Sequence, residues 1–385
     1  MANNLTTHRF QTDAGSGEEY YLVTHEVSLQ HGGIRLDRFL KSRYRKRSRE
    51  VLKRAIDEGS ISIRRTGGPH LRVGRLKPST VLLSGDQVLV KSERKPEPRV
   101  NFDYRVIFED ETLFVIEKPA NLPVHPAGRY FFNTLLVHLK TEGMKNPLKM
   151  EREYFLVHRI DKETSGILVL SKDREVCTGL TQQFASRTTE KRYLAVVRGL
   201  PPAEFEVGEA MRRSRNSKIS LKMEIAPESE GGQSAYTRFR RLEVAGDFAL
   251  VECFPKTGRQ HQIRVHLEHA GHPIVGDKLY GITEAEALRF FERSHLSAEA
   301  QARMLLPRHA LHATTLAFVH PRTGQRMEFH APLPPDLRGF LDAQSRGDFK
   351  PDLSAWGPVQ EEAIYTASDF ESDSEEDHEL PTDSE

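Results

Sequence analysis

One short stretch of this chain cannot be buried in a protein core, and it divides the sequence into two folding units. The segment KSERKPEPRVN, which ends at Asn101, is charged, contains two prolines and offers almost no apolar side chain. Proline lacks a backbone donor and interrupts helices and sheets, so this composition is typical of a linker. We predict a linker at residues 96–101, a small domain at 34–95 before it and a larger domain at 102–340 after it.

The two ends of the chain carry opposite charge. From Ile34 to Arg99 there are 19 Lys and Arg against 7 Asp and Glu, whereas residues 361–385 hold 11 acidic residues and no Lys or Arg. A basic front end is typical of nucleic-acid binding, with solubility as the alternative. We predict a flexible arm at 1–33 with one strand near Tyr20–Val23, and a disordered acidic tail at 357–385.

The composition excludes several classes of protein. Hydrophobic residues make up 37% of the chain, which is enough for a core and excludes disorder throughout. We find no apolar run of about 18 residues, the length that a membrane span needs. The polar start MANNLTTHRF does not fit a secretory signal, and two cysteines cannot form a disulfide scaffold. We therefore expect a cytoplasmic location.

Hydrophobic spacing predicts an α+β fold with a mixed, largely antiparallel sheet in the larger domain. In the small domain we predict a helix near residues 34–44, a second helix from the cap Ser48 to Gly59, and a strand at 61–63. In the larger domain the pattern predicts a hairpin at 106–119 and helices near 133–140 and 175–186. Further strands are predicted at 166–172, 192–199, 247–255 and 261–267.

The segment HRIDKETSGILVLSK, residues 158–172, places a single carboxylate among cations. Asp161 lies between Arg159 and Lys162, and nearby positive charge keeps a carboxylate ionised. An ionised Asp on a loop beside a buried strand can act as a nucleophile or base, although a surface ion pair is the simpler interpretation.

A second polar segment, KTGRQHQIRVHLEHAGHPIVGDKLYG, covers residues 256–281. Strand alternation would put Gln262, Arg264 and His266 on one face. A buried arginine needs a partner, and Asp161 is a natural one for Arg264. The histidines at 261, 266, 269 and 272 lack the cysteines or carboxylates that would complete a tetrahedral metal site, so we predict no metal. No segment has the phosphate-cradling P-loop pattern.

Both segments resemble the hallmark motifs of the RluA-type pseudouridine synthases. EDETLFVIEKPANLPVHPAG, KRYLAVVRG, ALHATTLAFVHPRTG and APLPPDL resemble further motifs of that family, in register from about Asn101 to Leu337. LDRFLKSRYRKRSREVLKRAIDEGSISI, followed by LLSGDQVLV, resembles an S4 RNA-binding domain. The resemblance implies a pseudouridine synthase catalytic domain at 102–340 preceded by an S4-like domain at 34–95.

The family resemblance also implies a reaction and its residues. A uridine in folded RNA is isomerised to pseudouridine, which requires no cofactor or metal. Asp161 would be the nucleophile, either at C1′ or through elimination of the C2′ proton. Arg264 would keep that carboxylate ionised, Tyr193 would stack on the flipped uracil and assist removal of the C5 proton, and Arg159 would fill the gap left in the RNA.

The S4-like domain would supply RNA affinity through its cations. These residues are Arg43, Arg45, Lys46, Arg47, Arg49, Lys53 and Arg54. We expect removal of residues 1–99 to weaken RNA binding but to leave the chemistry intact. The acidic tail either competes with RNA for this surface or is a passive solubility tail, and we favour the second.

The substrate and two competing functions remain open at this point. We expect ribosomal or transfer RNA as the partner, and GRYFFNTLLVHL at 128–139 resembles the family branch that includes transfer-RNA enzymes. We expect a monomer. One alternative is a non-catalytic RNA-binding protein, which the intact set of Asp161, Tyr193 and Arg264 disfavours. The other is a glycosidase-like hydrolase, which would need a second carboxylate such as Glu163.

Overall fold

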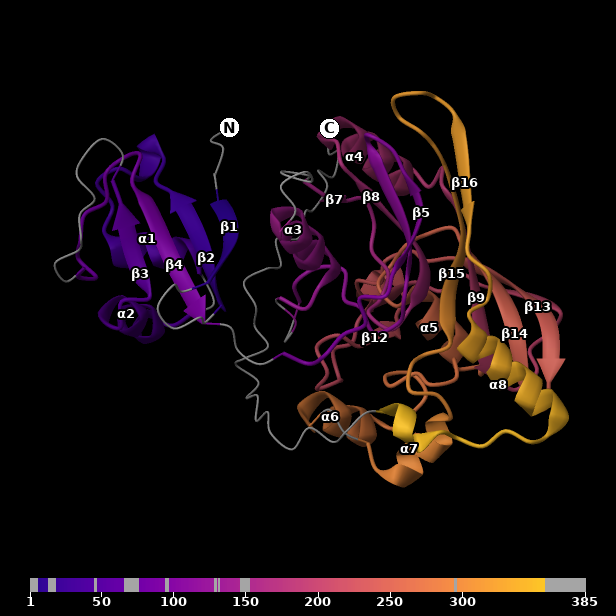
Figure 1. Ribbon diagram of the computed structural model, residues 1–385. Coiled ribbons are helices and arrows are strands. Elements are labelled where there is room, and N and C mark those ends of the chain that lie inside the picture. Colours follow the sequence, from indigo (N-terminus) through magenta and orange to yellow (C-terminus); the bar gives the residue numbers. More distant parts are fainter. Residues whose placement is uncertain are drawn as a thin grey trace. The chain divides into compact units, whose positions relative to one another are not determined.

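The computed structural model describes residues 6–12, 19–44, 47–65, 76–93, 97–127, 130, 132–145, 153–293 and 296–356. The predicted acidic tail and two of the predicted RNA-binding cations, Arg45 and Lys46, lie outside these residues. The chain forms two compact units (Figure 1). One consists mainly of residues up to Pro98, and the other consists of Arg99–Pro126 and the residues that follow Asn133.

The first unit is a small antiparallel sheet with two helices. Its strand order is β1-β2-β4-β3. The elements are β1 Thr6–Thr12, β2 Glu19–Glu26, η1 Leu29–His31, α1 Leu36–Arg43, α2 Arg49–Asp57, β3 Ile61–Arg64 and β4 Gln87–Glu93. Leu36, Phe39 and Leu40 of α1 are buried against Leu52 and Ile56 of α2 and the strands. The predicted helices and the strand at 61–63 are confirmed.

The start of the chain differs from the prediction of a flexible arm with one strand. Two strands lie there, and β2 pairs along its length with β4, so it is an interior strand of the sheet. Val23 and Val27 are buried in the core of the unit. The apolar residues at 20–23 were visible in the sequence, but their pairing with a strand more than 60 residues later was not.

The second unit is built on a ten-stranded sheet. Its main order is β10-β13-β14-β9-β15-β8-β6-β5, with β16 beside β15 and β7 beside β8. All pairs are antiparallel except β15 with β8. The strands are β5 Arg105–Glu109, β6 Leu113–Lys118, β7 Phe155–Leu156, β8 Ser165–Ser171, β9 Glu190–Arg198, β10 Glu204–Val207, β13 Thr237–Ala245, β14 Phe248–Pro255, β15 Leu311–Val319 and β16 Arg326–His330.

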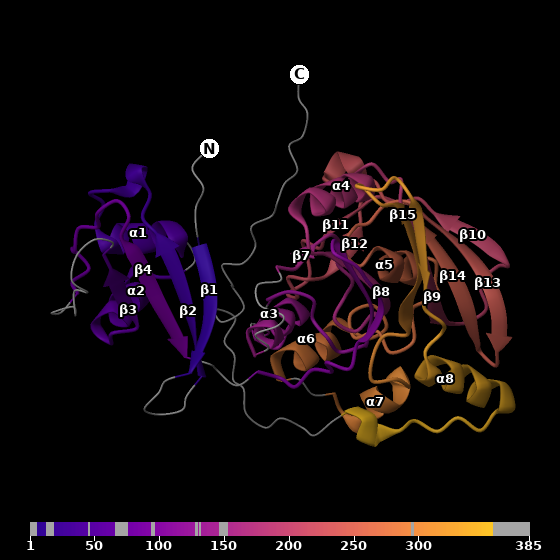
Figure 2. The same ribbon diagram turned by 45° about the horizontal axis from the view of Figure 1, so that its top comes forward.

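Helices and a small hairpin cover this sheet (Figure 2). The hairpin pairs β11 Met211–Arg213 with β12 Met223–Ile225. The helices are α3 Leu135–Lys145, α4 Arg174–Ala185, α5 Gln262–His269, α6 Glu284–Arg293, α7 Ala298–Met304 and α8 Pro335–Arg346, with the short turns η3 Glu228–Glu230 and η4 Leu353–Trp356. α4 packs on β8 and β15, and α8 packs on β13 and β14.

The predicted fold class is confirmed: the larger unit is α+β with a largely antiparallel sheet. Within the described part of the chain, no helix has the length and apolar character of a membrane span. The S4 assignment of the first unit stays a prediction.

One predicted strand is wrong in a way that matters for the site. Residues 261–267 were expected to be extended, but Gln262–His269 form the helix α5. Polar and apolar residues alternate from Gln262 to Leu267, which imitates a strand, but in the structure all six are buried, the polar ones included. In a short segment buried on all sides, periodicity does not distinguish a strand from a helix.

Candidate active site

Asp161 lies on a loop, residues 157–164, that leads into the fully buried strand β8; we call it the Asp161 loop. The turn is closed by a hydrogen bond from the Thr164 N–H to the Asp161 carbonyl, 3.1 Å. The hydroxyl of Thr164 lies 2.7 Å from Nε2 of His309, and that of Ser165 lies 2.9 Å from Nδ1 of His312. The Thr-Ser pair therefore fastens the loop to the segment that enters β15.

Glycine is required immediately after this pair. Gly166 has φ +110°, and a Cβ at this position would lie 2.2 Å from the Ala313 carbonyl oxygen. β8 and β15 meet at this point as the parallel pair of the sheet, with Gly166 opposite Ala313. The sequence Thr-Ser-Gly thus has a local structural reason: two hydroxyl anchors and one close backbone approach.

A buried lysine on β6, the strand that pairs with β8, also holds the loop. Lys118, at the end of β6, is fully buried, and its ammonium donates to the carbonyls of Pro119, Leu122 and Lys162. The Leu122 N–H donates to the Lys162 carbonyl as well, 3.1 Å. These bonds place Lys162, the residue after Asp161, on a fixed backbone. Lys118 was not predicted from the sequence as part of the site, because a lysine at a strand end usually faces solvent.

The helix α5 brings Arg264 to Asp161. Its first turn is organised by Gln262, whose side-chain oxygen accepts from the Thr257 hydroxyl and the Arg259 N–H, while its amide donates to Tyr236 and Thr237. The residue before it, His261, has φ +56°, which lets the chain turn into the helix. The expected partnership of Arg264 with Asp161 is confirmed: Nη1 donates to Oδ2 at 2.8 Å.

Arg264 lies between two carboxylates. Its Nε and Nη2 donate to the two oxygens of Asp277 at 2.6 and 2.9 Å, and its Nη1 is left for Asp161. The Asp277 side chain is 0% exposed and the Arg264 side chain 6%, whereas that of Asp161 is 25% exposed. The buried carboxylate holds the guanidinium in place, and the other carboxylate is accessible to a substrate.

The charges in this cluster favour an ionised Asp161. Burial by itself would raise the pKa of Asp161, but the positive charges of His261, which is protonated only at low pH, and of Arg264 lower it well below its usual range. Burial likewise opposes the charge of Arg264, yet its pKa is raised because Asp277 and Asp161 stabilise the cation. One guanidinium cation pairs with two carboxylate anions, so the cluster of Asp161, Arg264 and Asp277 has a net negative charge.

His261 adds an uncharged group beside Asp161. Its Nε2 lies 3.9 Å from Oδ1 of Asp161, and its Nδ1 lies 2.9 Å from the hydroxyl of Tyr280. Burial, helped by the charge of Arg264, lowers the pKa of His261 to about 4. His261 is therefore neutral at pH 7, and the positive charge that holds Asp161 comes from Arg264.

Tyr193 is half-buried on β9, opposite Cys253 of β14 and Ala313 of β15. Its ring contacts two of the hydrophobic clusters of the unit. Burial raises the pKa of Tyr193, and the negative charge of Asp161 raises it further. The phenol of Tyr193 is therefore neutral, and it lies close enough to Asp161 to be affected by the charge of that carboxylate.

Arg159, two residues before Asp161, is exposed on the same loop. Its charge contributes to lowering the pKa of His125 to about 4, after burial, and it also acts on His261. Arg159 thus lies near the histidines that flank the site, with no carboxylate partner among the described residues.

The predicted RNA-binding cations that the structure describes belong to the first unit, on and next to α1 and α2. Arg47, Arg49, Lys53 and Arg54 are exposed. Arg43 is half-buried, with its guanidinium 5.3 Å from the ring centre of Phe39, and that of Arg47 lies 5.1 Å from the ring of Tyr44. In α2 the cations Arg49, Lys53 and Arg54 are exposed, whereas Leu52 and Ile56 are buried.

The four histidines considered as metal ligands each have another neighbour. Besides His261, His266 lies 3.0 Å from the Thr237 hydroxyl, His272 lies 3.1 Å from the Arg198 carbonyl, and His269 lies 4.0 Å from Glu209. In the part of the chain that the structure describes, no three His, Cys, Asp or Glu side chains are grouped as metal ligands.

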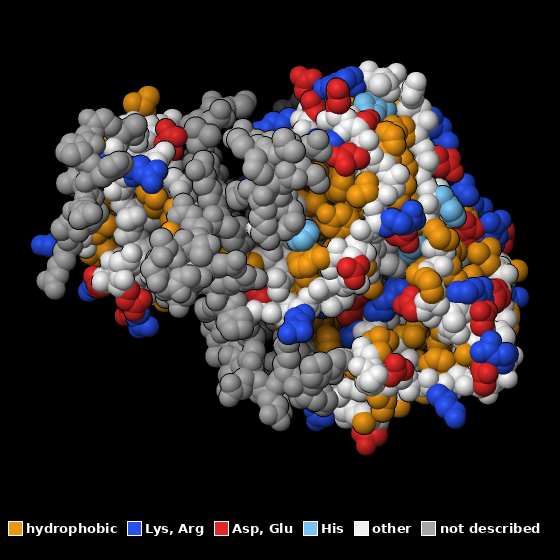
Figure 3. All heavy atoms as spheres, viewed as in Figure 1, with side chains coloured by type: hydrophobic (Ala, Val, Ile, Leu, Met, Phe, Trp, Pro, Cys, Tyr) orange, Lys and Arg blue, Asp and Glu red, His pale blue; other side chains and the backbone are white. Residues whose placement is uncertain are grey.

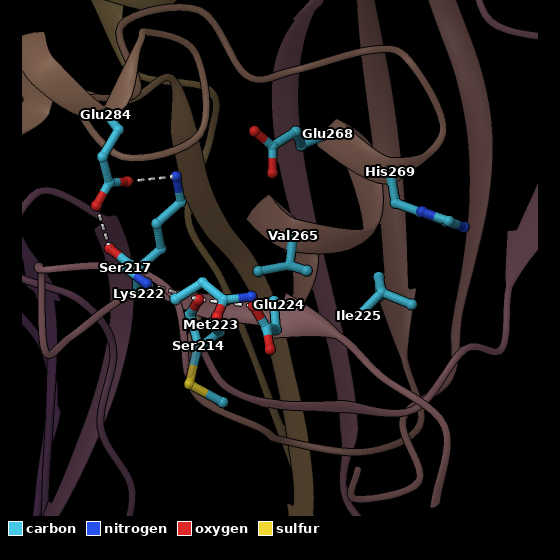
Figure 4. A pocket seen from close by; sticks show the side chains of 11 residues that line it. Ser214, Ser217, Lys222, Met223, Glu224, Ile225, Val265, Glu268, His269 and Glu284 are labelled. Carbon is cyan, nitrogen blue, oxygen red and sulfur yellow. Dashed lines mark hydrogen bonds and ion pairs between the residues drawn. The ribbon is translucent and has the colours of Figure 1, made fainter. Parts of the chain in front are cut away.

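A pocket of about 550 Å³ lies apart from Asp161, between the β11–β12 hairpin, α5 and the start of α6. Figure 4 shows its polar lining, in which Glu284 pairs with Lys222 at 3.0 Å and accepts from Ser217. Asp161, Arg264 and Tyr193 do not line it, so we do not place the reaction there.

On the face of the second unit drawn in Figure 3, Lys and Arg side chains are interspersed with Asp and Glu. Exposed ion pairs of opposite charge occur in this unit, as between Arg326 and Glu328. This face carries no single-sign field, in contrast to the basic sequence of the first unit.

The chain is similar to known RNA-modifying enzymes. A model of the RNA pseudouridylate synthase family matches residues 112–269. The ribosomal large subunit pseudouridine synthase D of Zymomonas mobilis is 34% identical over 82% of this chain and 96% of that protein, and synthase C of Pasteurella multocida is 31% identical over 82% and 92%. Among solved structures, the human RNA pseudouridylate synthase domain containing 4 is 27% identical, covers 63% of this chain and 92% of that one, and has a TM-score of 0.48.

Identity above 30% over nearly the whole length of these relatives agrees with the motifs read from the sequence. The matched region contains Asp161, Tyr193 and Arg264. The chain belongs to the RluA-type family of RNA pseudouridine synthases.

Proposed function

We propose that this protein isomerises uridine to pseudouridine in ribosomal RNA of the large subunit, with Asp161 as the reacting carboxylate. The choice of ribosomal over transfer RNA is supported by the names of the relatives that align over most of the chain. The short segment at 128–139 favours the other substrate, because it resembles the transfer-RNA branch of the family. This segment lies partly outside the described residues.

The observation that carries the proposal is the arrangement of Asp161, Arg264 and Asp277. A carboxylate acts as a nucleophile or base only when it is ionised, accessible and held in one orientation. Arg264 binds one oxygen of Asp161 at 2.8 Å, Asp277 fixes Arg264, and a quarter of the Asp161 side chain remains exposed. A protein that merely bound RNA would have no need of a partly exposed carboxylate held by a buried arginine.

The proposed reaction balances without a cofactor. The N1–C1′ bond breaks, the uracil rotates, C5 forms a bond with C1′, and the C5 proton leaves to solvent while N1 regains a proton. Asp161 either forms a bond to C1′ that breaks when C5 attacks, or removes the C2′ proton and later returns it; both routes use the ionised carboxylate. We propose that Arg159, exposed on the same loop, occupies the space that the flipped uridine leaves.

The hydrolase alternative loses its second carboxylate. Glu163 pairs with the Lys278 ammonium at 2.6 Å and accepts from the His309 N–H. Burial would raise its pKa, but Lys278 lowers the pKa of Glu163 to about 2. An ionised, fully engaged carboxylate cannot protonate a leaving group, so the acid and base pair of a glycosidase is missing.

The function is tested by release of tritium from C5 of uridine in RNA that lacks modifications. Separate ribosomal and transfer RNA pools are incubated with the protein. We expect release from the large-subunit RNA, together with an unchanged nucleoside mass. Release from transfer RNA alone would correct the substrate, and appearance of free uracil would identify a hydrolase.

A second prediction concerns the cations of α2 and its approach. Changing Arg47, Arg49, Lys53 and Arg54 to alanine is expected to weaken RNA binding about tenfold or more near physiological salt, because each lost phosphate contact lowers the salt slope by roughly 0.7 to 0.9. The single-turnover rate at saturating RNA is expected to stay the same. Binding isotherms at several salt concentrations measure both effects.

The control for this experiment is Arg326→Ala, which removes an exposed arginine that already pairs with Glu190 and Glu328. It should leave the salt slope unchanged. If the salt slope is also unchanged in the fourfold variant, these cations of the first unit do not contribute to RNA binding.

A third prediction separates the ring of Tyr193 from its hydroxyl. Tyr193→Phe keeps the ring in both hydrophobic clusters, so RNA binding and melting temperature should hold. If the phenol assists removal of the C5 proton, tritium release should slow by about 100-fold or more. Tyr236→Phe, at the residue before β13, is the control, since the Tyr236 hydroxyl donates a hydrogen bond to Glu206. A wild-type rate for Tyr193→Phe would limit Tyr193 to stacking.

A further inference from the structure

A second buried ion pair connects the Asp161 loop to the turn that contains Lys278. Glu163 follows Asp161 by two residues, and its Oε1 is 2.6 Å from Nζ of Lys278. Its Oε2 accepts from the backbone N–H of His309 at 3.1 Å. The two side chains are 14% and 6% exposed. Both oxygens of Glu163 are thus committed to the protein and are not available to a substrate.

Lys278 is itself held on several sides. Its ammonium donates to the Pro307 carbonyl at 2.7 Å. It also lies 5.3 Å from the ring centre of Phe290 on α6 and 5.6 Å from that of Trp356 on η4. Cations over aromatic faces are attracted by the ring quadrupole, most strongly by tryptophan. Segments that are distant in sequence therefore converge on one ammonium.

The position of Lys278 in the chain links it to the reacting carboxylate. It follows Asp277, which binds Arg264 through both oxygens. The dipeptide Asp277–Lys278 therefore holds the Asp161 loop at two points. Asp277 acts on Asp161 through Arg264, and Lys278 binds Glu163 directly. A shift of this turn would move both contacts together.

Trp356 ties the last described turn of the chain to this point. It packs with a hydrophobic cluster formed by α6 and α7, which includes Phe290 and Met304. It is the only tryptophan in the protein, so its fluorescence reports on this place alone.

We propose that Glu163, Lys278 and Trp356 form a support that sets the position of Asp161, and that the turn η4 thereby tunes catalysis. The inference rests on the proposed function. These are positioning residues: none of them touches the uridine. A displacement of about 1 Å at a reacting group can cost up to 100-fold in rate, so loss of the support should lower kcat while RNA binding is retained.

The test compares Glu163→Gln, Lys278→Met and Trp356→Phe in the full chain. Single-turnover pseudouridine formation and RNA affinity are measured for each. Glu163→Gln and Lys278→Met are expected to lower the single-turnover rate about 10- to 100-fold with the Kd for RNA within about threefold of wild type. Trp356→Phe keeps an aromatic ring and should cost less, about threefold.

Two further measurements separate positioning from general stability. Lys278→Arg keeps the cation and should recover part of the rate that Lys278→Met loses. The double variant Glu163→Gln with Lys278→Met should be no slower than the worse single variant, because a neutral pair leaves no buried charge alone. Trp356 emission should change in Lys278→Met and in Glu163→Gln, since both alter the ammonium beneath its ring.

The matched control is Glu109→Gln, which breaks the pair between Glu109 and the largely buried Lys172 at the far end of β8. Its rate should equal that of wild type. If folded Glu163→Gln and Lys278→Met also turn over at the wild-type rate, or change only RNA affinity, the support is overturned while the function stands. If the wild type itself forms no pseudouridine, the function fails and the inference with it.

Discussion

Asp161→Asn is expected to abolish pseudouridine formation, lowering the single-turnover rate by at least about 1000-fold. The substitution keeps the size of the side chain but removes the negative charge that both routes of the proposed mechanism require. It also leaves one hydrogen-bond acceptor for Nη1 of Arg264, which now donates at 2.8 Å. Tritium release and nucleoside analysis measure the loss.

The protein should remain folded and should still bind RNA, because Asp277 continues to neutralise Arg264. Asp173→Asn is the matched control. Asp173 caps α4 by accepting from the Val176 N–H, and asparagine is an equally good cap. The control should react at the wild-type rate. Product formation by Asp161→Asn at a comparable rate would show that another group carries the reaction.

Arg264→Met is expected to have the second largest effect, on both stability and rate. Asp277 would be left as a fully buried carboxylate without its cation, which costs about 3–5 kcal/mol of unfolding free energy. The rate should fall by about 100-fold or more, because Asp161 loses both its orientation and its counter-charge. Chemical denaturation and single-turnover kinetics separate the two effects.

The pH dependence of the rate should shift in a definite direction in Arg264→Met. In the wild type the pKa of Asp161 lies below its ordinary value, so the carboxylate stays ionised as the pH falls through the usual range of carboxyl groups. Without Arg264, burial is less strongly opposed and raises the pKa of Asp161. The acid limb of the rate profile should therefore move to higher pH in Arg264→Met. A limb at the wild-type position would mean that Arg264 does not control this ionisation.

Arg338→Met is the matched control for Arg264→Met. Arg338 also lies between two carboxylates, Glu243 and Asp342, but its side chain is 38% exposed on α8. An exposed pair contributes at most about 1 kcal/mol. The control should therefore change stability little and the rate not at all. Arg264→Lys, which keeps the charge but loses the planar fork, should fall between the two.

Much of the fold was readable because it depends on local rules. The cap Ser48, the end of the helix at Gly59, the alternation at Ile61 and Ile63 and the hairpin around Asp110 all reflect short-range backbone chemistry. The partnership of Arg264 with Asp161 was also predictable, since a buried arginine must find a carboxylate.

The local rules failed where burial removes the pattern on which they depend. α5 was predicted as a strand because polar and apolar residues alternate from 262 to 267, whereas in the structure all six are buried in a helix. Lys118 gave no signal, since nothing in its neighbourhood indicates that three carbonyls would surround its ammonium. Asp277 was not among the predicted site residues, although its two oxygens fix the arginine of the site.

The sequence alone predicted the division at the linker, the fold class, the basic character of the first unit and the residues that we propose to react. These follow from composition, period and motif, which are properties of neighbouring residues. The tertiary structure decided which side chains support Asp161. Asp277, Lys278, His309 and Trp356 lie 116 to 195 residues beyond it in the chain. Only the folded sheet and its covering helices bring their charges and rings within bonding distance of the Asp161 loop.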